Sequence, residues 1–205
     1  YWSSLAASAS SYECGLSPLQ LASSRGDLAR VQAILRDATA RTIRYARAEG
    51  YGRAQVDAWM RTILDLATPW TALMEATWGG HASIVRVLLR AGADPGVAAN
   101  DGTTALFVAV HKGHDAVVTA LIGAGAALDL QDAGGFTALM FATAHQGHLS
   151  TARRLLRAGA RTDLKPKGGL TALQCAEYKG HADVAQLLRE HAAAAPAPAA
   201  PAAAE

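Results

Sequence analysis

The chain has 205 residues, of which 51% are hydrophobic and 18% are charged, and its formal net charge is +2. This length allows one sizeable domain or a short array of repeats, and so weak a charge argues against a dedicated nucleic-acid-binding protein, which is usually strongly basic. Two cysteines are too few for a disulfide framework, so we expect an intracellular protein, cytoplasmic or nuclear.

The chain opens with a segment of low regularity. Residues 1–15 are rich in Ser and Ala and show no clean hydrophobic period, so we interpret them as a flexible lead-in. The motif Ser17-Pro18-Leu19 then appears, with Gly26 nine residues after Ser17. The same offset separates Thr71 from Gly80 further along the chain, which relates the two segments.

Residues 41–67 form a basic, amphipathic segment. Arg41, Arg44 and Arg47 are three residues apart and therefore share one side of a helix. After Gly50-Tyr51-Gly52, an apolar stripe at helical spacing predicts a further helix; it comprises Val56, Trp59, Met60, Ile63 and Leu64. We interpret the insertion as a lengthened second helix of the first repeat, followed by an extra helix packed on the stack. We favour a helix that caps the hydrophobic end of the array, with solvated arginines. A docking surface for an acidic partner at Arg41, Arg44 and Arg47 is the alternative.

A period of about 33 residues governs the remainder of the chain. Thr-Ala-Leu begins at Thr71, Thr104, Thr137 and Thr171, in steps of 33, 33 and 34 residues. A Gly-His pair follows each one, and a Gly-Ala pair closes the first three units. Fixed periods of this length are typical of stacked repeats.

The sequence of each unit predicts two helices. Thr71 can cap a short first helix that ends at Gly80-His81. A second helix with a wider apolar stripe follows from Ile84 and stops at Gly92, and a polar loop leads to the next Thr. One helix pair cannot bury its apolar faces alone, so neighbouring units must stack.

These motifs resemble the ankyrin repeat, whose pattern has a Thr-Pro-Leu-His opening, a central Gly-His and a Gly-Ala close. The resemblance implies an all-α ankyrin-repeat solenoid over residues 16–191, with a helical insertion after the first repeat. We expect a divergent repeat at about 16–40, the insertion at about 41–67, and repeats at 68–100, 101–133, 134–167 and 168–191. Residues 192–205, rich in Ala and Pro, predict a disordered tail.

The sequence departs from the family pattern at several positions, and these departures predict local differences in structure. Alanine replaces the family proline, and Met74, Phe107, Met140 and Gln174 stand where the family has His. We therefore expect these units to depend more on packing than on hydrogen bonds. The third unit has one extra residue, which predicts a bulged turn within 143–146.

The resemblance implies a non-catalytic module that binds another protein on its concave side, through loop tips and exposed positions of the first helices. Aromatic residues among these positions are favoured as anchors. Carried onto this chain, the positions are Trp70, Trp78, Asn100, Asp101, Thr103, His111, Lys112, Phe136, His145, Gln146, Lys167, Leu170, Tyr178 and Lys179.

The sequence offers only weak candidates for catalytic and metal-binding residues. His111 and His114, like His145 and His148, have a spacing that could hold a metal. The second member of each pair belongs to the repeat itself, and we interpret it as structural. Cys175 has no histidine at useful helical spacing. We expect no catalytic residues, cofactor, metal, small-molecule substrate or membrane span.

Two other functions stay open at this point. The array could be the targeting or regulatory arm of a larger multidomain enzyme, because Tyr1 and the Ala/Pro tail both look like joints. Alternatively, the arginines of the insertion and a second basic cluster at 153–167 could bind anionic lipid or nucleic acid.

Overall fold

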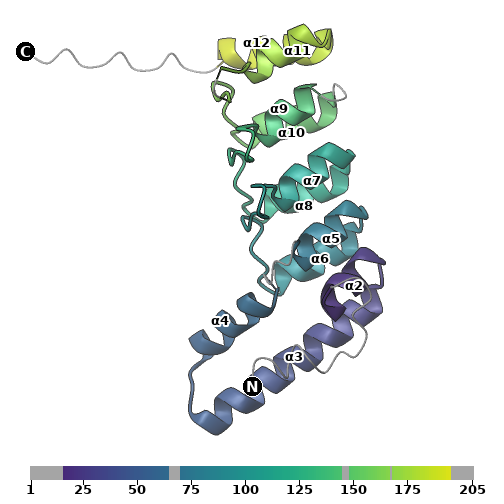
Figure 1. Ribbon diagram of the computed structural model, residues 1–205, viewed down its shortest axis with the longest axis vertical. Coiled ribbons are helices and arrows are strands. Elements are labelled where there is room, and N and C mark those ends of the chain that lie inside the picture. The colour runs from purple at the N-terminus through teal and green to yellow at the C-terminus, as the bar shows by residue number, and fades with distance from the viewer. Residues whose placement is uncertain (1–15, 65–69, 145–147, 167, 195–205) are drawn as a thin grey trace, which may run out of the picture.

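The computed structural model describes residues 16–64, 70–144, 148–166 and 168–194 (Figure 1). Apart from loops, turns and one isolated β-bridge between Ala98 and Thr104, these residues are helical, which confirms the all-α class. The helices are α2 (Pro18–Ser24), α3 (Leu28–Glu49), α4 (Arg53–Leu64), α5 (Ala72–Trp78), α6 (Ala82–Arg90), α7 (Ala105–Lys112), α8 (Asp115–Gly123), α9 (Ala138–Ala144), α10 (Leu149–Arg157), α11 (Ala172–Tyr178) and α12 (Ala182–Ala194).

The helices stack in pairs along one column (Figure 1). The pairs α5–α6, α7–α8, α9–α10 and α11–α12 follow one another, and α2 packs on α5 at the base. Helix α3 extends away from the base, and α4 returns beside it towards the column (Figure 1). The insertion therefore forms an arm at the N-terminal end of the stack.

The first helix of every unit begins with the same hydrogen bond. A Ser or Thr hydroxyl oxygen accepts the backbone N–H three residues further on, at 3.2–3.4 Å; the acceptors are Ser17, Thr71, Thr104, Thr137 and Thr171. Such bonds satisfy an amide that has no partner within its helix. Because α2 starts in the same way and packs on α5, we infer that α2 and the start of α3 form a fifth, N-terminal repeat.

Two histidines of the Gly-His pairs, His81 and His114, link their units to the unit before them. His81 Nε2 donates to the Ser24 carbonyl at 3.2 Å, and His114 Nε2 donates to the Trp78 carbonyl at 3.3 Å. Gly80, at φ 70°, leaves room for this ring, since a Cβ there would lie 2.8 Å from His114. The histidines are therefore structural at these two positions.

The extra residue of the third unit lengthens the turn between its helices. The backbone N–H of His81 and that of His114 each bond to the carbonyl five residues earlier, whereas His148 bonds to Ala142, six residues earlier, at 3.2 Å. Residues 145–147 themselves lie outside the described part of the chain. The stack continues past this turn, because α9 contacts both α7 and α11.

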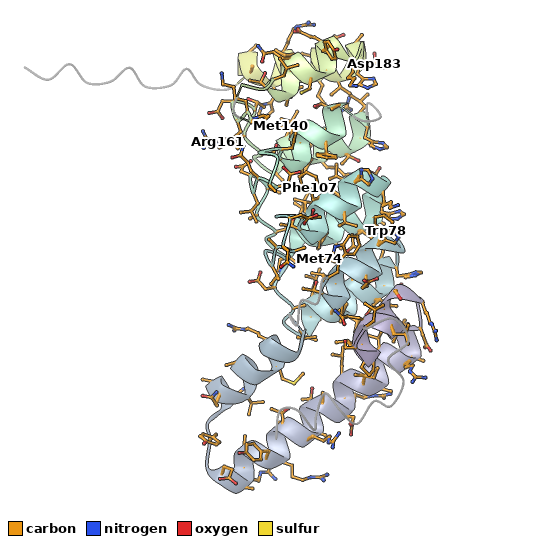
Figure 2. The ribbon with its side chains drawn as sticks, in the orientation of Figure 1. Met74, Trp78, Phe107, Met140, Arg161 and Asp183 are labelled. Atoms are coloured by element: carbon orange, nitrogen blue, oxygen red, sulfur yellow. The ribbon has the colours of Figure 1, made fainter. Side chains whose placement is uncertain are left out.

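Apolar side chains occupy the positions where the family has histidine. Met74, Phe107 and Met140 are buried in a single core that runs the length of the column (Figure 2). Gln174, the fourth member, is exposed, and its side chain completes a capping box with Thr171. Three of the four side chains therefore contribute to apolar packing, and Gln174 does not.

Hydroxyl and carboxylate groups also tie neighbouring second helices together. Asp115 on α8 accepts hydrogen bonds from Ser150 at 2.9 Å and from Thr151 at 2.7 Å, both on α10. Burial raises the pKa of Asp115, but these bonds and the nearby Arg154 outweigh it and lower the pKa overall. The stack therefore stabilises the ionised form of Asp115 over its protonated form.

The ends of α3 and α12 bear on the expected boundaries. Helix α3 is 22 residues long and continues without a break past residue 40, as expected for a lengthened second helix of the first repeat. Helix α12 ends at Ala194, three residues into the expected tail. Alanine is the best helix former, and the first helix-breaking proline comes only at Pro196.

A buried hydroxyl in α5 provides a test of this packing. Thr77 is fully buried and its Oγ1 has no hydrogen-bond partner among the described residues, while Val110 occupies the same repeat position. Thr77→Val should therefore raise the free energy of unfolding, by up to about 1 kcal/mol, in urea denaturation.

Thr104→Val is the matched control, because it removes a hydroxyl that caps α7. This substitution should lower the free energy of unfolding by about 1 kcal/mol. Equal losses from the two substitutions would show that the Thr77 hydroxyl does have a partner in solution.

Candidate partner-binding surface

The residues singled out from the sequence fall at repeated positions of the first helices. Trp70, Thr103, Phe136 and Leu170 each precede a Thr cap, and Trp78, His111 and Tyr178 each lie seven residues after one. In the first of these units the two positions lie together, because the rings of Trp70 and Trp78 are in contact. We call this side of α5, α7, α9 and α11, with the loop tips before them, the first-helix face.

Trp78 is a large, partly exposed aromatic residue of the first-helix face (Figure 2). Its side chain is 47% exposed, and the Trp70 ring meets it edge-on, with centroids 5.3 Å apart. The Lys112 ammonium lies 3.3 Å from the centroid of the Trp78 ring. Trp70 itself is partly buried against the core. The next repeat therefore holds a large exposed ring in place by a cation–π contact.

A second aromatic cluster lies one unit further along, around Phe141. The ring of Phe141 is 4.3 Å from that of Phe107, 5.9 Å from that of Phe136 and 6.0 Å from the His111 ring. Phe136 and Phe141 are half-buried, and His111 is exposed. Sequence reasoning missed Phe141. Phe141 lies four residues after Thr137, in the middle of the exposed side of α9. This spacing could have identified it from the sequence.

The loop tip between α6 and α7 is held by its own hydrogen bonds. Asp101 Oδ1 accepts the Thr103 N–H at 2.9 Å, and this bond lowers the pKa of Asp101. The Asp101 carbonyl accepts the N–H of Ala133, in the next loop, at 2.8 Å. A Cβ on Gly102 would lie 2.9 Å from the backbone of Asp132. Neighbouring loop tips, including exposed Asn100, are therefore fixed relative to one another.

The C-terminal end of the first-helix face is open to solvent. Leu170 is 40% exposed and Tyr178 is 79% exposed. Lys179 lies over the Tyr178 ring, with its ammonium 5.9 Å from the centroid. An exposed aromatic with a neighbouring lysine thus occurs near both ends of the array.

The remaining site candidates lie elsewhere. His145, Gln146 and Lys167 fall outside the described residues. Arg41, Arg44 and Arg47 are exposed on α3, in the arm, and Arg41 forms an ion pair with Asp37 at 3.6 Å. The arginines of α3 therefore belong to a different surface from the tryptophans.

The described residues do not gather into a group of metal ligands. In residues 16–64, 70–144, 148–166 and 168–194, no three His, Cys, Asp or Glu side chains come together as metal ligands. Cys175 is buried, and burial raises the pKa of its thiol. No described helix combines the length and apolar character that crossing a bilayer requires.

Glu75 is a second position that the sequence reasoning missed, and it carries a pH prediction. It lies on α5 three residues before Trp78, at the repeat position of Phe141, and burial raises its pKa. A raised pKa means that the folded protein binds this proton more tightly, so its contribution to stability is lost as the pH rises. Glu75→Gln should therefore increase the free energy of unfolding at about pH 7 and have little effect at about pH 4.

Asp101→Asn provides the opposite control, because the pKa of Asp101 is lowered. Loss of the Asp101 carboxylate should lower the free energy of unfolding at about pH 7 and have little effect at about pH 3. Urea denaturation at each pH measures both variants. A destabilising Glu75→Gln at neutral pH would contradict the assignment of Glu75.

Comparison with known proteins agrees with this geometry. The family model for ankyrin repeats in three copies matches residues 55–132 and 106–197, whereas no curated protein matches the chain. The family match begins within α4, so it leaves out α2 and α3. Ankyrin repeats generally mediate protein–protein interaction, and proteins built from them are typically non-catalytic. With more than half of its length matched, and with its helix pairs stacked as described, the chain belongs to the ankyrin repeat family.

Proposed function

We propose that this protein is a non-catalytic module that binds another protein on the first-helix face, the concave side of the array in this family. The observation that carries the proposal is the position of Trp78, which is 47% exposed although Trp70 and Lys112 hold its ring. An aromatic side chain left in water is unfavourable unless something covers it. Tryptophan and tyrosine are also the residues most enriched among binding hot spots.

The rigidity of this face supports the same function. The Trp78 ring is held on two sides, and the loop carrying Asp101 is bonded to the loop that follows it. Ordering flexible side chains on binding costs about 0.5–1.5 kcal/mol for each one. A surface whose anchors are already ordered avoids most of this cost.

The spacing of the anchors indicates the size of the partner. Trp78 and Tyr178 lie three units apart, and packed helices are about 10 Å apart, so the two rings are separated by about 30 Å. An interface of ordinary size covers about 800 Å² on each partner and spans such a distance. The proposed partner is therefore a folded domain or a long segment rather than a small molecule.

Substitution of the two anchors tests the proposal. Affinity capture with the full chain, compared with the Trp78→Ala/Tyr178→Ala form, should identify proteins that depend on the first-helix face. Each single substitution should weaken the captured partner by more than about 1 kcal/mol, or about fivefold in Kd, in calorimetry. The free energy of unfolding should change much less, because both rings are exposed.

Arg86→Ala and Arg153→Ala serve as controls, since both arginines are exposed on second helices, α6 and α10. They should leave the affinity unchanged. A partner that responds to these arginines but not to the aromatics would place the interface on the opposite side of the array. Parallel losses of folding and binding would make Trp78 and Tyr178 structural residues.

A further inference from the structure

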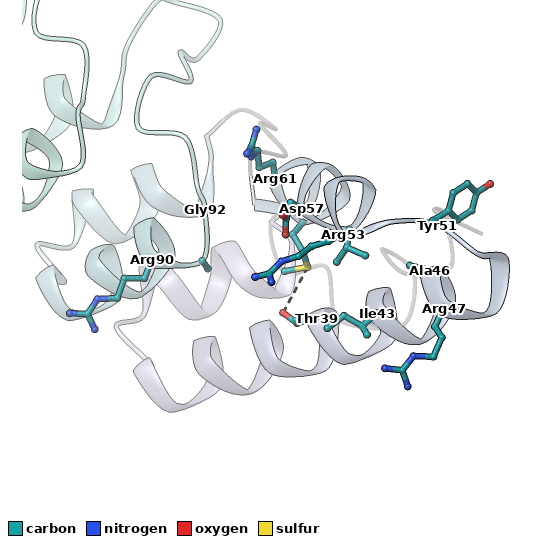
Figure 3. Close-up of a pocket in the computed structure, with 13 residues that line it drawn as sticks. Thr39, Ile43, Ala46, Arg47, Tyr51, Arg53, Asp57, Arg61, Arg90 and Gly92 are labelled. Atoms are coloured by element: carbon teal, nitrogen blue, oxygen red, sulfur yellow. Dashed lines mark hydrogen bonds between the residues drawn. The ribbon is translucent and has the colours of Figure 1, made fainter.

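The arm contains a groove that the repeat pattern does not account for. A cavity of about 680 Å³ lies between α3 and α4 and reaches the end of α6 (Figure 3). Its α3 wall runs from Thr39 to Arg47 and its α4 wall from Arg53 to Arg61. Each wall is about 12 Å long at the rise of an α-helix, which matches two helical turns of an occupant.

The floor of the groove is apolar. Ile43 on α3 is 44% exposed, and Val56 and Met60 line the facing side of α4. The Met60 sulfur lies 3.9 Å from Thr39 Oγ1, so the two helices meet at the bottom of the groove (Figure 3). Exposed apolar surface in a recess favours an occupant with apolar side chains of its own.

The rim of the groove is basic. Four arginines and one aspartate line it: Arg47, Arg53, Arg61, Arg90 and Asp57. The Arg53 side chain reaches into the gap between the helices, and those of Arg47, Arg61 and Arg90 point outward around it (Figure 3). Among the residues that the structure describes, none of these four arginines forms an ion pair. Unpaired guanidinium groups around an apolar floor are complementary to carboxylates that flank apolar side chains.

We propose that this groove binds a short, acidic amphipathic segment of a partner protein, about two helical turns long. Its apolar side chains pack on Ile43, Val56 and Met60, and its carboxylates pair with Arg53 and Arg61. The groove is separate from the first-helix face, so this binding is additional to the function proposed above.

The same features favour a peptide over other anionic ligands. A flat membrane surface cannot reach Met60, which is 7% exposed at the bottom of the recess. Single-stranded nucleic acid binds on stacked aromatic platforms, and Tyr51 is the one aromatic residue among those lining the described groove. Inorganic phosphate would leave the apolar floor uncovered.

A synthetic peptide tests the proposal directly. The probe is a fluorescein-labelled helical peptide of about twelve residues, with Leu on one face and Glu on the other; its partner probe carries Gln in place of Glu. In fluorescence anisotropy with the full chain, the Glu peptide should bind and the Gln peptide should bind at least tenfold more weakly. Equal binding of the two peptides, or no binding of the Glu peptide, would overturn the proposal.

Charge reversal locates the site. Arg53→Glu with Arg61→Glu should weaken the Glu peptide at least tenfold, and the milder Arg53→Gln with Arg61→Gln should weaken it severalfold. The matched control is Arg36→Glu with Arg44→Glu, which makes the same charge change at exposed positions of α3 outside the groove. This control should keep the affinity within twofold. Equal losses of affinity in the two charge-reversal variants would indicate diffuse charge attraction and would overturn the proposal that the peptide binds in the groove.

Two further variants separate this site from the rest of the protein. Ile43→Ala should weaken the peptide about threefold, with an unchanged far-ultraviolet circular dichroism spectrum. Trp78→Ala with Tyr178→Ala should bind the peptide as the unaltered chain does, because these residues lie outside the groove. Loss of peptide binding in this aromatic variant would contradict a separate site, whatever its effect on the partner of the first-helix face.

Discussion

Burial of apolar surface between neighbouring helix pairs is the constraint on which the whole array depends. Helices α5, α9 and α11 have only seven residues each, and helices this short are not stable alone in water. The first helices form because Met74, Phe107, Met140 and their neighbours are covered by adjacent units. The side of each first helix that faces away from its own pair is then free to carry residues such as Trp78.

The parts of this structure that sequence could predict are those determined within one unit. Thr71 and Thr104 cap their helices because a hydroxyl needs only the amide three residues further on, and the period repeats that bond. The contact between Lys112 and Trp78 could not be predicted, since it depends on how two units face each other. The groove in the arm depends on the angle between α3 and α4, which no local spacing determines.

Two surfaces of different chemistry result from one chain. The first-helix face presents aromatic rings with lysines beside them, and the groove presents guanidinium groups around an apolar floor. The first surface arises from the repeats themselves, and the second forms between α3 and α4 where they approach the end of α6. The helical arm thus gives the N-terminal end of the column a surface chemistry that the first-helix face does not have.

The histidine bonds between units give the column a direction. His81 and His114 each donate to a carbonyl of the unit on their N-terminal side. A unit added at the C-terminal end brings its own donor to a carbonyl already in place, whereas removal of α2 would leave the imidazole of His81 without its acceptor. The two ends of such an array therefore differ chemically: loss of the first unit leaves an imidazole donor without its acceptor, and loss of a later unit leaves a backbone carbonyl without its donor.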